Sequence, residues 1–280
     1  MPSIAETIRR VQSQIAGSEP DSPRLDAEML IGHILGQSRS DLLADLPEPF
    51  PDDCTERLDE LVARRAAGEP MALIIGQREF FGLIFTVSPN VLTPRPETEH
   101  LVEWALAWLQ SRPHAQVIDI GTGSGALAIA LAANSPPSVA IVATDVSAEA
   151  LTIARRNAAS LAPHRIDFAE GDLFADQGGT FDLVIANLPY LTPGQISERR
   201  ELAFEPAIAL DGGRDGLDTI RRLIALLPER LKTGGAVALE IDPAQAPAVA
   251  QRLTDTLPGA QVQTIADLTG RSRVITAVRL

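Results

Sequence analysis

A strand, a glycine turn and an apolar helix follow one another directly near the middle of this chain, and this succession limits its fold more than any other feature. Val117–Ile120 is a short, mostly apolar run, Gly121–Gly125 has the sequence Gly-Thr-Gly-Ser-Gly, and Ala126–Ala133 is apolar throughout. Alternating glycines let the backbone turn sharply from a strand into a helix and present its amides at the positive end of that helix. The pattern predicts an α/β domain.

Strands and helices continue to alternate on the carboxyl side of this unit. We expect further strands at Val139–Thr144, Ile166–Ala169, Leu183–Ala186 and Val237–Ile241, with helices at Ala148–Leu161, Gly216–Leu231 and Ala244–Leu257. Buried strands that alternate with helices form a mostly parallel sheet with helices on both faces. The last expected strands, Val262–Ala266 and Arg273–Val278, are close enough in sequence to form an antiparallel hairpin at the sheet edge.

Residues 1–70 lack strand signals and show helical periodicity. Apolar residues recur at a spacing that places them on one helix face: Ile4, Ile8, Val11 and Ile15. Breaks rich in glycine and proline divide the segment into about four short helices, the last at Asp52–Ala67. The segment therefore predicts a small N-terminal helical bundle.

Residues 71–92 differ from the segments on either side. Short apolar and aromatic runs at Ala72–Ile75 and Phe80–Val87 flank Gly76–Glu79. This arrangement predicts a β-hairpin that links the bundle to a main domain at residues 93–280. The main domain would begin with a helix at Glu97–Gln110.

The composition of this chain limits the classes of partner that it can bind and the cellular compartment in which we expect it. Thirty-seven acidic residues against 24 basic ones give a net charge of −13, which argues against a nucleic-acid partner because positive patches hold phosphate backbones. The longest apolar run, Ala126–Ala133, is too short to span a bilayer, so no membrane partner is expected. One cysteine, Cys54, and four scattered histidines predict neither a disulfide nor a metal site. The first ten residues lack the order of a secretory signal, and we expect a cytoplasmic protein.

An acidic residue ends the strand that follows the glycine turn. This residue, Asp145, lies 24 positions after Gly121, where a carboxylate can accept hydrogen bonds from both hydroxyls of a ribose. The turn is GxGxG and lacks the GxGxxG spacing of dinucleotide-binding proteins, which argues against a pyrophosphate site. A lone glycine pattern is also typical of a plain tight turn, but its combination with Asp145 favours nucleoside binding.

The glycine turn and the acid one strand later resemble the motifs of the class I S-adenosylmethionine-dependent methyltransferases. The resemblance implies that the turn lies beneath the methionine part of the donor and that Asp145 holds the ribose. It also implies that Asp172 accepts from the adenine amino group and that Leu173 forms an apolar wall for the ring. The alternative interpretation of Asp172 is a helix N-cap. The residues expected to contact the donor are Gly121, Thr122, Gly123, Ser124, Gly125, Asp145, Asp172, Leu173 and Asn187.

A second motif, Asn187-Leu188-Pro189-Tyr190, follows the strand Phe181–Ala186. It lies at the carboxyl edge of the expected sheet, where α/β folds place their ligands. Asn and Pro also end strands without any chemical role. The tetrad nevertheless resembles the NPPY signature of enzymes that methylate planar nitrogens, either glutamine side-chain amides or exocyclic amino groups of bases. Leu188 stands where that signature usually has proline.

Methylation of a planar nitrogen explains the residue types of the tetrad. Such a nitrogen is a weak nucleophile because its lone pair is delocalised. Asn187 Oδ1 and the backbone carbonyl of Leu188 can accept its two N–H bonds, which turns the lone pair towards the methyl group and stabilises the developing positive charge. Pro189 keeps residue 188 out of the helical region, and Tyr190 can stack on the planar group. These four residues are the predicted catalytic residues.

Further segments resemble the release factor glutamine methyltransferase family, also known as HemK. They are Gly76–Phe81, Thr93–Glu99, Phe204–Pro206, Gly212–Leu217 and Asp267–Arg271. The resemblance implies methylation of the side-chain nitrogen N5 of glutamine in the Gly-Gly-Gln motif of class 1 peptide chain release factors. It further implies S-adenosyl-L-methionine as the donor and the bundle as a docking surface for the release factor.

Two other functions stay open at this point. An adenine-N6 methyltransferase acting on DNA or RNA would share the tetrad and the donor, but the acidic charge and the lack of an obvious base-recognition domain argue against it. A nucleoside-binding interaction module without catalysis would have no use for Asn187, Pro189 and Tyr190.

Overall fold

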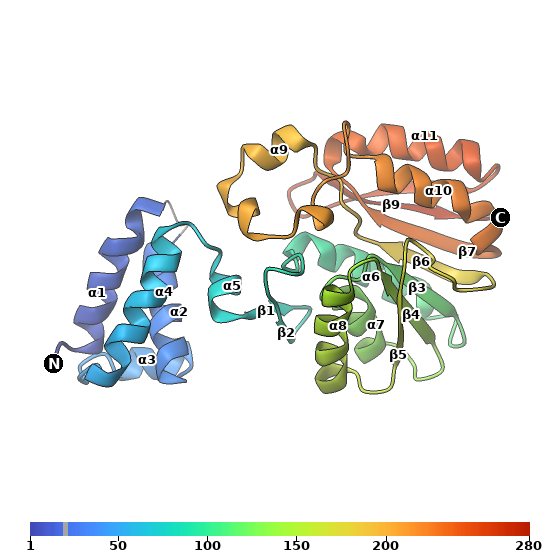
Figure 1. The fold of residues 1–280 in the computed structure, drawn as a ribbon. Coiled ribbons are helices and arrows are strands. Elements are labelled where there is room, and N and C mark those ends of the chain that lie inside the picture. The colour runs from blue at the N-terminus through green and yellow to red at the C-terminus, as the bar shows by residue number, and fades with distance from the viewer. Residues whose placement is uncertain (19–21) are drawn as a thin grey trace. The chain divides into compact units, whose positions relative to one another are not determined.

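The computed structural model describes residues 1–18 and 22–280, which form two compact units, Met1–Gly76 and Gln77–Leu280. The first unit is helical, and the second is built around a sheet with helices on both faces (Figure 1).

The first unit is the helical bundle that the periodicity predicts. Its helices are α1 Ile4–Ile15, α2 Pro23–Leu35, α3 Arg39–Ala44, α4 Thr55–Ala66 and α5 Met71–Ile75, with 3₁₀ turns η1 Ala16–Ser18 and η2 Asp52–Cys54. Ser3 and Glu6 form a capping box that starts α1, which satisfies backbone N–H groups left free at a helix start. The four apolar residues of α1 with helical spacing are buried in the core of the unit.

The second unit contains a seven-stranded sheet in the order β5-β4-β3-β6-β7-β9-β8. Its strands are β3 Gln116–Ile120, β4 Ala140–Asp145, β5 Ile166–Glu170, β6 Phe181–Ala186, β7 Leu231–Glu240, β8 Gln261–Ala266 and β9 Ser272–Val278. The strands from β5 to β7 pair in parallel, and β9 pairs antiparallel with both β7 and β8. The predicted fold class, a mostly parallel sheet with an antiparallel edge hairpin, is confirmed.

Helices cover both faces of this sheet (Figure 1). One face carries α6 Glu99–Leu109, α7 Ala126–Asn134 and α8 Ala148–Leu161, and the other carries α10 Asp218–Arg230 and α11 Ala246–Thr256. Side chains of a strand alternate between the faces. In β6, for example, Leu183 and Ile185 join the first core, while Val184 and Ala186 join the second. Burial on both faces is the reason why the central strands are mostly apolar.

Short elements lie between the regular ones in the second unit. They are η3 Pro96–Thr98, α9 Pro193–Ser197, η4 Arg200–Phe204, η5 Ala207–Ala209 and η6 Pro243–Gln245. The segment from α9 to η5 follows β6 and precedes α10, so it extends from the carboxyl edge of the sheet. No pattern in the sequence predicted these short elements, because three to five residues are too few for a helical alternation to be recognised.

The strand predicted at Ala72–Ile75 is wrong. These residues belong to α5, which follows Pro70 and ends at Gly76 in the left-handed conformation, with a φ of 76°. The hairpin itself is formed by β1 Gln77–Phe80 and β2 Leu83–Thr86. It therefore begins later in the chain than predicted and belongs to the second unit. A short apolar run does not distinguish a strand from a turn of buried helix.

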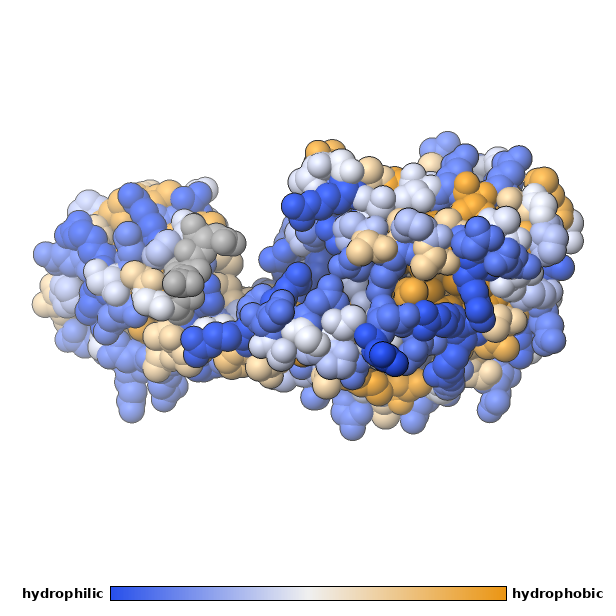
Figure 2. Space-filling view, turned by 90° about the horizontal axis from the view of Figure 1, so that it is seen from above, coloured by the Kyte–Doolittle hydropathy of each residue, from blue (hydrophilic) through white to orange (hydrophobic). Residues whose placement is uncertain are grey.

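On the face of each unit that Figure 2 shows, most residues are hydrophilic and the apolar residues form separate patches. Within residues 1–18 and 22–280, no helix combines the length and the apolar character needed to cross a membrane.

Candidate active site

The carboxyl ends of β3, β4 and β6 border a cavity of ≈ 360 Å³ in the second unit. Its lining includes nearly all of the residues predicted to contact the donor: Gly121, Thr122, Gly123, Ser124, Asp145, Asp172, Leu173 and Asn187. Gly125 is the exception. It caps the start of α7, and a Cβ there would lie 2.8 Å from Ile129 Cδ1, so its lack of a side chain serves helix packing.

The glycine turn that follows β3 is held by backbone hydrogen bonds to β4. The amides of Gly121 and Thr122 both donate to the carbonyl of Thr144, at 2.8 and 2.9 Å. Gly121 adopts a φ of 72°, and a Cβ at this position would lie 3.0 Å from Leu188 Cδ2. The turn is thus packed directly against the loop that carries the predicted catalytic residues.

Asp145, at the end of β4, fixes the same turn through its carboxylate. Its Oδ2 accepts from the amide of Gly123 at 2.8 Å, and its Oδ1 accepts from the amide of Ser147 at 2.9 Å. Burial raises the pKa of Asp145, and these backbone N–H donors oppose the rise. Each carboxylate oxygen keeps a lone pair for a further donor. Asp145 can therefore hold the turn and accept from ribose hydroxyls together.

We expect Asp145→Ala to weaken donor binding by about 1–3 kcal/mol, the scale for losing charge-assisted hydrogen bonds. The variant loses both the ribose acceptor and the brace on Gly123. Isothermal titration calorimetry measures the affinity, with Asp167→Ala, an exposed acid on the neighbouring strand β5, as the control. Unchanged donor affinity in a folded Asp145→Ala protein would remove Asp145 from the site.

The segment after β5 forms the far wall of the cavity. Leu173 is 6% exposed and lies in the left-handed region, with a φ of 49°, and the Thr144 hydroxyl donates to its carbonyl at 2.6 Å. A non-glycine residue in this region is uncommon, and strained residues of this kind cluster at functional sites. Asp172 is exposed and forms an ion pair with Arg222. It begins a turn and no helix, so the N-cap alternative for Asp172 is wrong.

The loop after β6 places two acceptors without partners beside the cavity. Asn187 Nδ2 donates to Thr98 Oγ1 at 3.2 Å. Within the described part of the chain, neither Asn187 Oδ1 nor the carbonyl oxygen of Leu188 has a hydrogen-bond partner. Both oxygens can therefore accept a hydrogen bond from an N–H or O–H group of a ligand that enters the site. Leu188 is buried at 5% exposure, which explains how an apolar residue fits here in place of proline.

A second cavity of ≈ 650 Å³ adjoins the same loop. Tyr190 lines it together with four arginines and three acids, which are Arg95, Arg199, Arg271, Arg273, Glu97, Glu240 and Asp242. Asn187 and Leu188 line both cavities, while Pro189 lines only the first. The predicted catalytic tetrad therefore stands where the two cavities meet.

The sequence analysis did not predict three residues that form hydrogen bonds with the tetrad: Thr98, Glu240 and Gln245. The Thr98 hydroxyl and the Tyr190 hydroxyl both donate to the carboxylate of Glu240, and Gln245 Nε2 donates to the carbonyl of Tyr190. Glu240 had a usable signal, because it is an acid that follows the apolar run Ala236–Leu239 at the end of its strand, as Asp145 ends β4. Thr98 belongs to the Thr93–Glu99 segment of the family resemblance, but nothing in that segment marked it as a partner of the tetrad. Gln245 had no signal, since it lies in a short 3₁₀ turn.

A buried acid below the glycine turn was also missed. Asp119 of β3 is fully buried; its Oδ2 accepts from Thr122 Oγ1 at 2.6 Å and from the amide of Ala128 at 3.2 Å. Burial raises the pKa of Asp119 to about 7. Asp119 does not line either cavity, so its contacts support the shape of the turn from beneath. In the described residues, no group of three or more His, Cys, Asp or Glu is placed to hold a metal ion.

The chain is similar to known proteins along almost its whole length. The PrmC N-terminal domain family matches residues 6–76, and the methyltransferase small domain family matches residues 101–204. The chain is 38% identical to a release factor glutamine methyltransferase from Deinococcus radiodurans, over 99% of this chain and 98% of that protein. It is 42% identical to one from Neisseria gonorrhoeae, over 90% and 92%. A solved structure of ribosomal protein L11 methylase from Lactobacillus delbrueckii subsp. bulgaricus superposes with a TM-score of 0.52 at 26% identity, over 69% and 83%.

Proposed function

This chain belongs to the release factor glutamine methyltransferase family, and from that premise we propose how its two cavities divide the reaction. The enzyme methylates a glutamine of release factors and takes the methyl group from S-adenosyl-L-methionine. The cavity beside the glycine turn holds the donor, and the second cavity admits the acceptor glutamine. The observation that carries this assignment is that Asn187 and Leu188 line both cavities.

The residues of the first cavity fit the donor. The glycine turn leaves no side chain over the cavity floor at Gly121 and Gly123, Asp145 offers carboxylate oxygens to a ribose, and the buried Leu173 offers an apolar wall to a base. The donor supplies an electrophilic methyl group on a sulfonium sulfur. Asp172 is proposed to accept from the adenine amino group through Oδ1, because Arg222 binds only its Oδ2.

The acceptor amide is proposed to lie between the two free acceptors of the loop. A primary amide nitrogen has two N–H bonds, and Asn187 Oδ1 and the Leu188 carbonyl provide one acceptor for each. Two fixed acceptors orient the nitrogen towards the methyl group and stabilise the positive charge that develops there. Tyr190, which faces the second cavity, packs on the planar amide. We propose that the acceptor is nitrogen N5 of the glutamine in the Gly-Gly-Gln motif of class 1 factors.

Peptide mass spectrometry of a release factor after reaction with labelled donor tests this function. We expect one methyl group per factor, located on the glutamine amide of the Gly-Gly-Gln motif, and none on a factor in which that glutamine is alanine. A parallel reaction with duplex and single-stranded DNA examines the adenine-N6 alternative. Methyl transfer to DNA, or donor binding with no transfer to any of these substrates, would contradict the proposal.

The helical first unit is proposed to dock the release factor. The family match at residues 6–76 covers this unit almost completely, while both cavities belong to the second unit. A protein that begins at Gln77 should therefore bind the donor, which also reports that it is folded, but should methylate the intact factor with a much lower kcat/KM. A short Gly-Gly-Gln peptide is the control substrate, since it should be used equally by both proteins. Equal kcat/KM on the intact factor would refute the docking role.

The proposed function also concerns the class of substrate and the cellular compartment of the enzyme. We propose a protein substrate, with neither a nucleic acid nor a membrane as partner, because the net charge of −13 disfavours long anionic surfaces. The reaction is proposed to occur in the cytoplasm, where release factors act in translation. Family membership favours this function over both the adenine-N6 and the non-catalytic alternatives.

A further inference from the structure

The loop Asn187–Tyr190, called the catalytic loop below, has two residues that are connected by a continuous set of hydrogen bonds. The connection passes through two residues outside the loop, Thr98 and Glu240. Asn187 Nδ2 donates to Thr98 Oγ1 at 3.2 Å, and the Thr98 hydroxyl donates to Glu240 Oε2 at 2.6 Å. The Tyr190 hydroxyl donates to the other oxygen of the same carboxylate, Glu240 Oε1, at 3.1 Å. Glu240 thus joins Asn187, through Thr98, to Tyr190.

The sheet register explains why Glu240 lies beside the loop. Strands β6 and β7 are parallel, and Ala186 pairs with Leu239. The next residue of each strand, Asn187 and Glu240, therefore lies at the same level of the carboxyl edge. Thr98 reaches this edge because it ends η3 immediately before α6, and α6 packs on both β6 and β7.

Burial of the Glu240 carboxylate costs desolvation free energy, and hydrogen bonds from two hydroxyl groups partly offset this cost. It is 1% exposed, and burial raises its pKa, while the hydrogen bonds from Thr98 and Tyr190 and the charge of Arg273 lower it. A carboxylate removed from water is strongly unfavourable unless its oxygens accept hydrogen bonds. Both oxygens of Glu240 are satisfied by groups of the site, which ties the burial of this acid to the position of the site.

The hydroxyl of Thr98 determines which way the Asn187 amide faces. A hydroxyl has a single hydrogen, and that hydrogen is directed to Glu240. The oxygen of Thr98 can then only accept from Asn187, which requires Nδ2 on this side and leaves Oδ1 on the other. With no hydroxyl at position 98, the amide could turn over and present its NH₂ group to the N–H bonds of the substrate, where two donors would meet.

We propose that Thr98 and Glu240 are positioning residues for methyl transfer, which hold the Asn187 amide with Oδ1 towards the acceptor and fix the ring of Tyr190. This inference rests on the proposed role of Asn187 as the acceptor that orients the substrate amide. Neither residue needs to touch the reacting atoms for this role. The role also gives a function to Thr98 of the Thr93–Glu99 segment, which lines the first cavity.

Thr98→Val, which keeps the shape of the side chain but removes the hydroxyl, provides the first test. We expect the single-turnover rate with release factor to fall by about 10- to 10²-fold, the range for a misplaced catalytic group, while KM and the donor Kd change little. Thr98→Ser restores the hydroxyl and should recover most of the rate. The matched control is Thr276→Val, because Thr276 is also buried in the second unit but lines neither cavity; its rate should equal that of the parent.

A double-mutant cycle with Asn187→Ala decides whether Thr98 acts through Asn187. We expect Thr98→Val to lower the rate in the parent and to have no further effect in the Asn187→Ala protein. The same loss in both backgrounds, or a Thr98→Val enzyme with the parent rate, would overturn the positioning role and leave the role of Asn187 standing. An Asn187→Ala enzyme with parent activity would instead refute the proposed function of Asn187, and the positioning role with it. If Thr98→Val does not fold, Glu240→Gln takes its place in the cycle, since its amide can accept from only one of the two hydroxyls.

Discussion

Asn187→Ala is expected to lower the single-turnover rate of methyl transfer by about 10²- to 10³-fold, the usual effect of removing one fixed transition-state contact. The variant loses Oδ1, one of the two free acceptors that face the site, and keeps only the carbonyl of Leu188. An amide held by one N–H bond rotates about that bond and no longer directs its lone pair at the methyl group. Most of the donor affinity should remain, because the glycine turn and Asp145 are held by contacts that do not involve Asn187.

Rapid-quench measurement with a saturating donor and a Gly-Gly-Gln release factor determines this rate, and calorimetry determines the donor Kd of the same protein. Asn134→Ala is the control, because Asn134 also donates through its side-chain amide, to the carbonyl of Ala130, but lines neither cavity. Parent turnover by a folded Asn187→Ala protein would eliminate the proposed mechanism.

Asn187→Asp separates the need for an acceptor from the need for a neutral amide. Aspartate keeps an acceptor oxygen for the substrate but cannot donate to Thr98, whose own hydrogen is directed to Glu240. It also adds a negative charge beside the sulfonium of the donor, which should strengthen donor binding. We therefore expect Asp to be more active than Ala and less active than the parent. An Asp variant slower than Ala would mean that the neutral amide matters more than its acceptor oxygen.

Those parts of the fold that depend on long periodic segments could be predicted from the sequence. Runs such as Phe181–Ala186 and Ala148–Leu161 are buried along their whole length or on one face, and they occur as β6 and α8 with the predicted bounds. The short run Ala72–Ile75 was misassigned, because four apolar residues bury equally well as a strand or as one helical turn. Ile74 packs in the core of the helical first unit, and this packing selects the helical turn. Tertiary packing of this kind leaves no local pattern.

The site could be predicted only as far as its motifs lie next to strand ends. The glycine turn, Asp145 and the Asn187 loop each follow a strand directly, and parallel strands bring their carboxyl ends to one edge. The supporting residues have no such mark: Thr98 is 89 positions from Asn187, and Glu240 is 50 positions from Tyr190. Their meeting depends on the register of β6 with β7 and on the packing of α6, and neither is encoded within a single segment.

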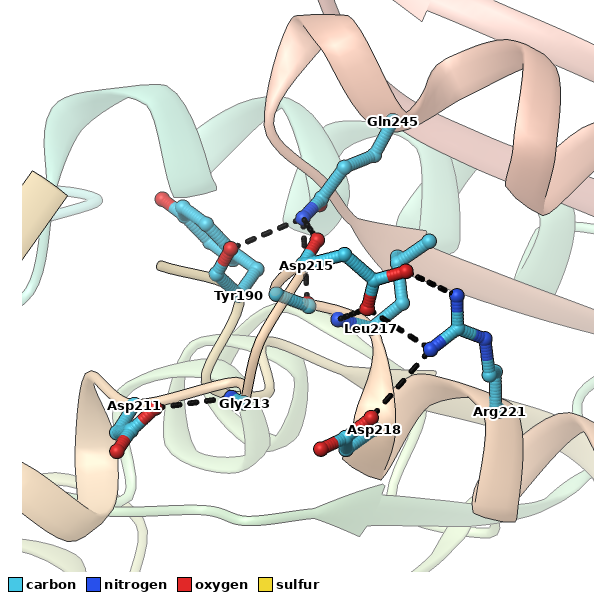
Figure 3. A network of polar contacts seen from close by, with 9 residues as sticks. Tyr190, Asp211, Gly213, Asp215, Leu217, Asp218, Arg221 and Gln245 are labelled. Atoms are coloured by element: carbon cyan, nitrogen blue, oxygen red, sulfur yellow. Dashed lines mark hydrogen bonds and ion pairs between the residues drawn. The ribbon is translucent and has the colours of Figure 1, made fainter. Parts of the chain in front are cut away.

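The conformation of the catalytic loop depends on a second loop, Asp211–Leu217, which packs against its backbone. Gln245 Nε2 donates to the carbonyl of Tyr190 at 2.9 Å (Figure 3). It also donates to the carbonyl of Gly216 at 3.2 Å. Arg221 binds the side chain of Asp215 and so holds the second loop from its other side (Figure 3). Gly216 has a φ of 74°, and a Cβ there would lie 2.1 Å from the carbonyl oxygen of Tyr190. The two backbones therefore approach more closely than any side chain allows.

Gly216→Ala is expected to reduce methyl transfer by about 10²-fold or more, because the added carbon must displace the carbonyl of Tyr190 and a shift of about 1 Å in a site has an effect of this size. The matched control is Gly234→Ala. Gly234 has nearly the same conformation, with a φ of 77°, but no atom lies within 4 Å of its Cβ position. Both variants incur the strain of a left-handed alanine, about 1–2 kcal/mol of folding free energy, and only Gly216→Ala also moves the catalytic loop.

Thermal unfolding and single-turnover rates of the two variants separate strain from displacement. Gly234→Ala should lose stability and keep the parent rate, whereas Gly216→Ala should lose more stability and most of the rate. The displacement acts on a backbone that Gln245 already binds, since the same Cβ would lie 2.5 Å from Gln245 Nε2. The loop therefore cannot relax without breaking the bond that positions Tyr190. Equal rates for the two alanine variants would show that the close approach of Gly216 has no part in holding the loop, and that the contacts of Glu240 and Thr98 suffice.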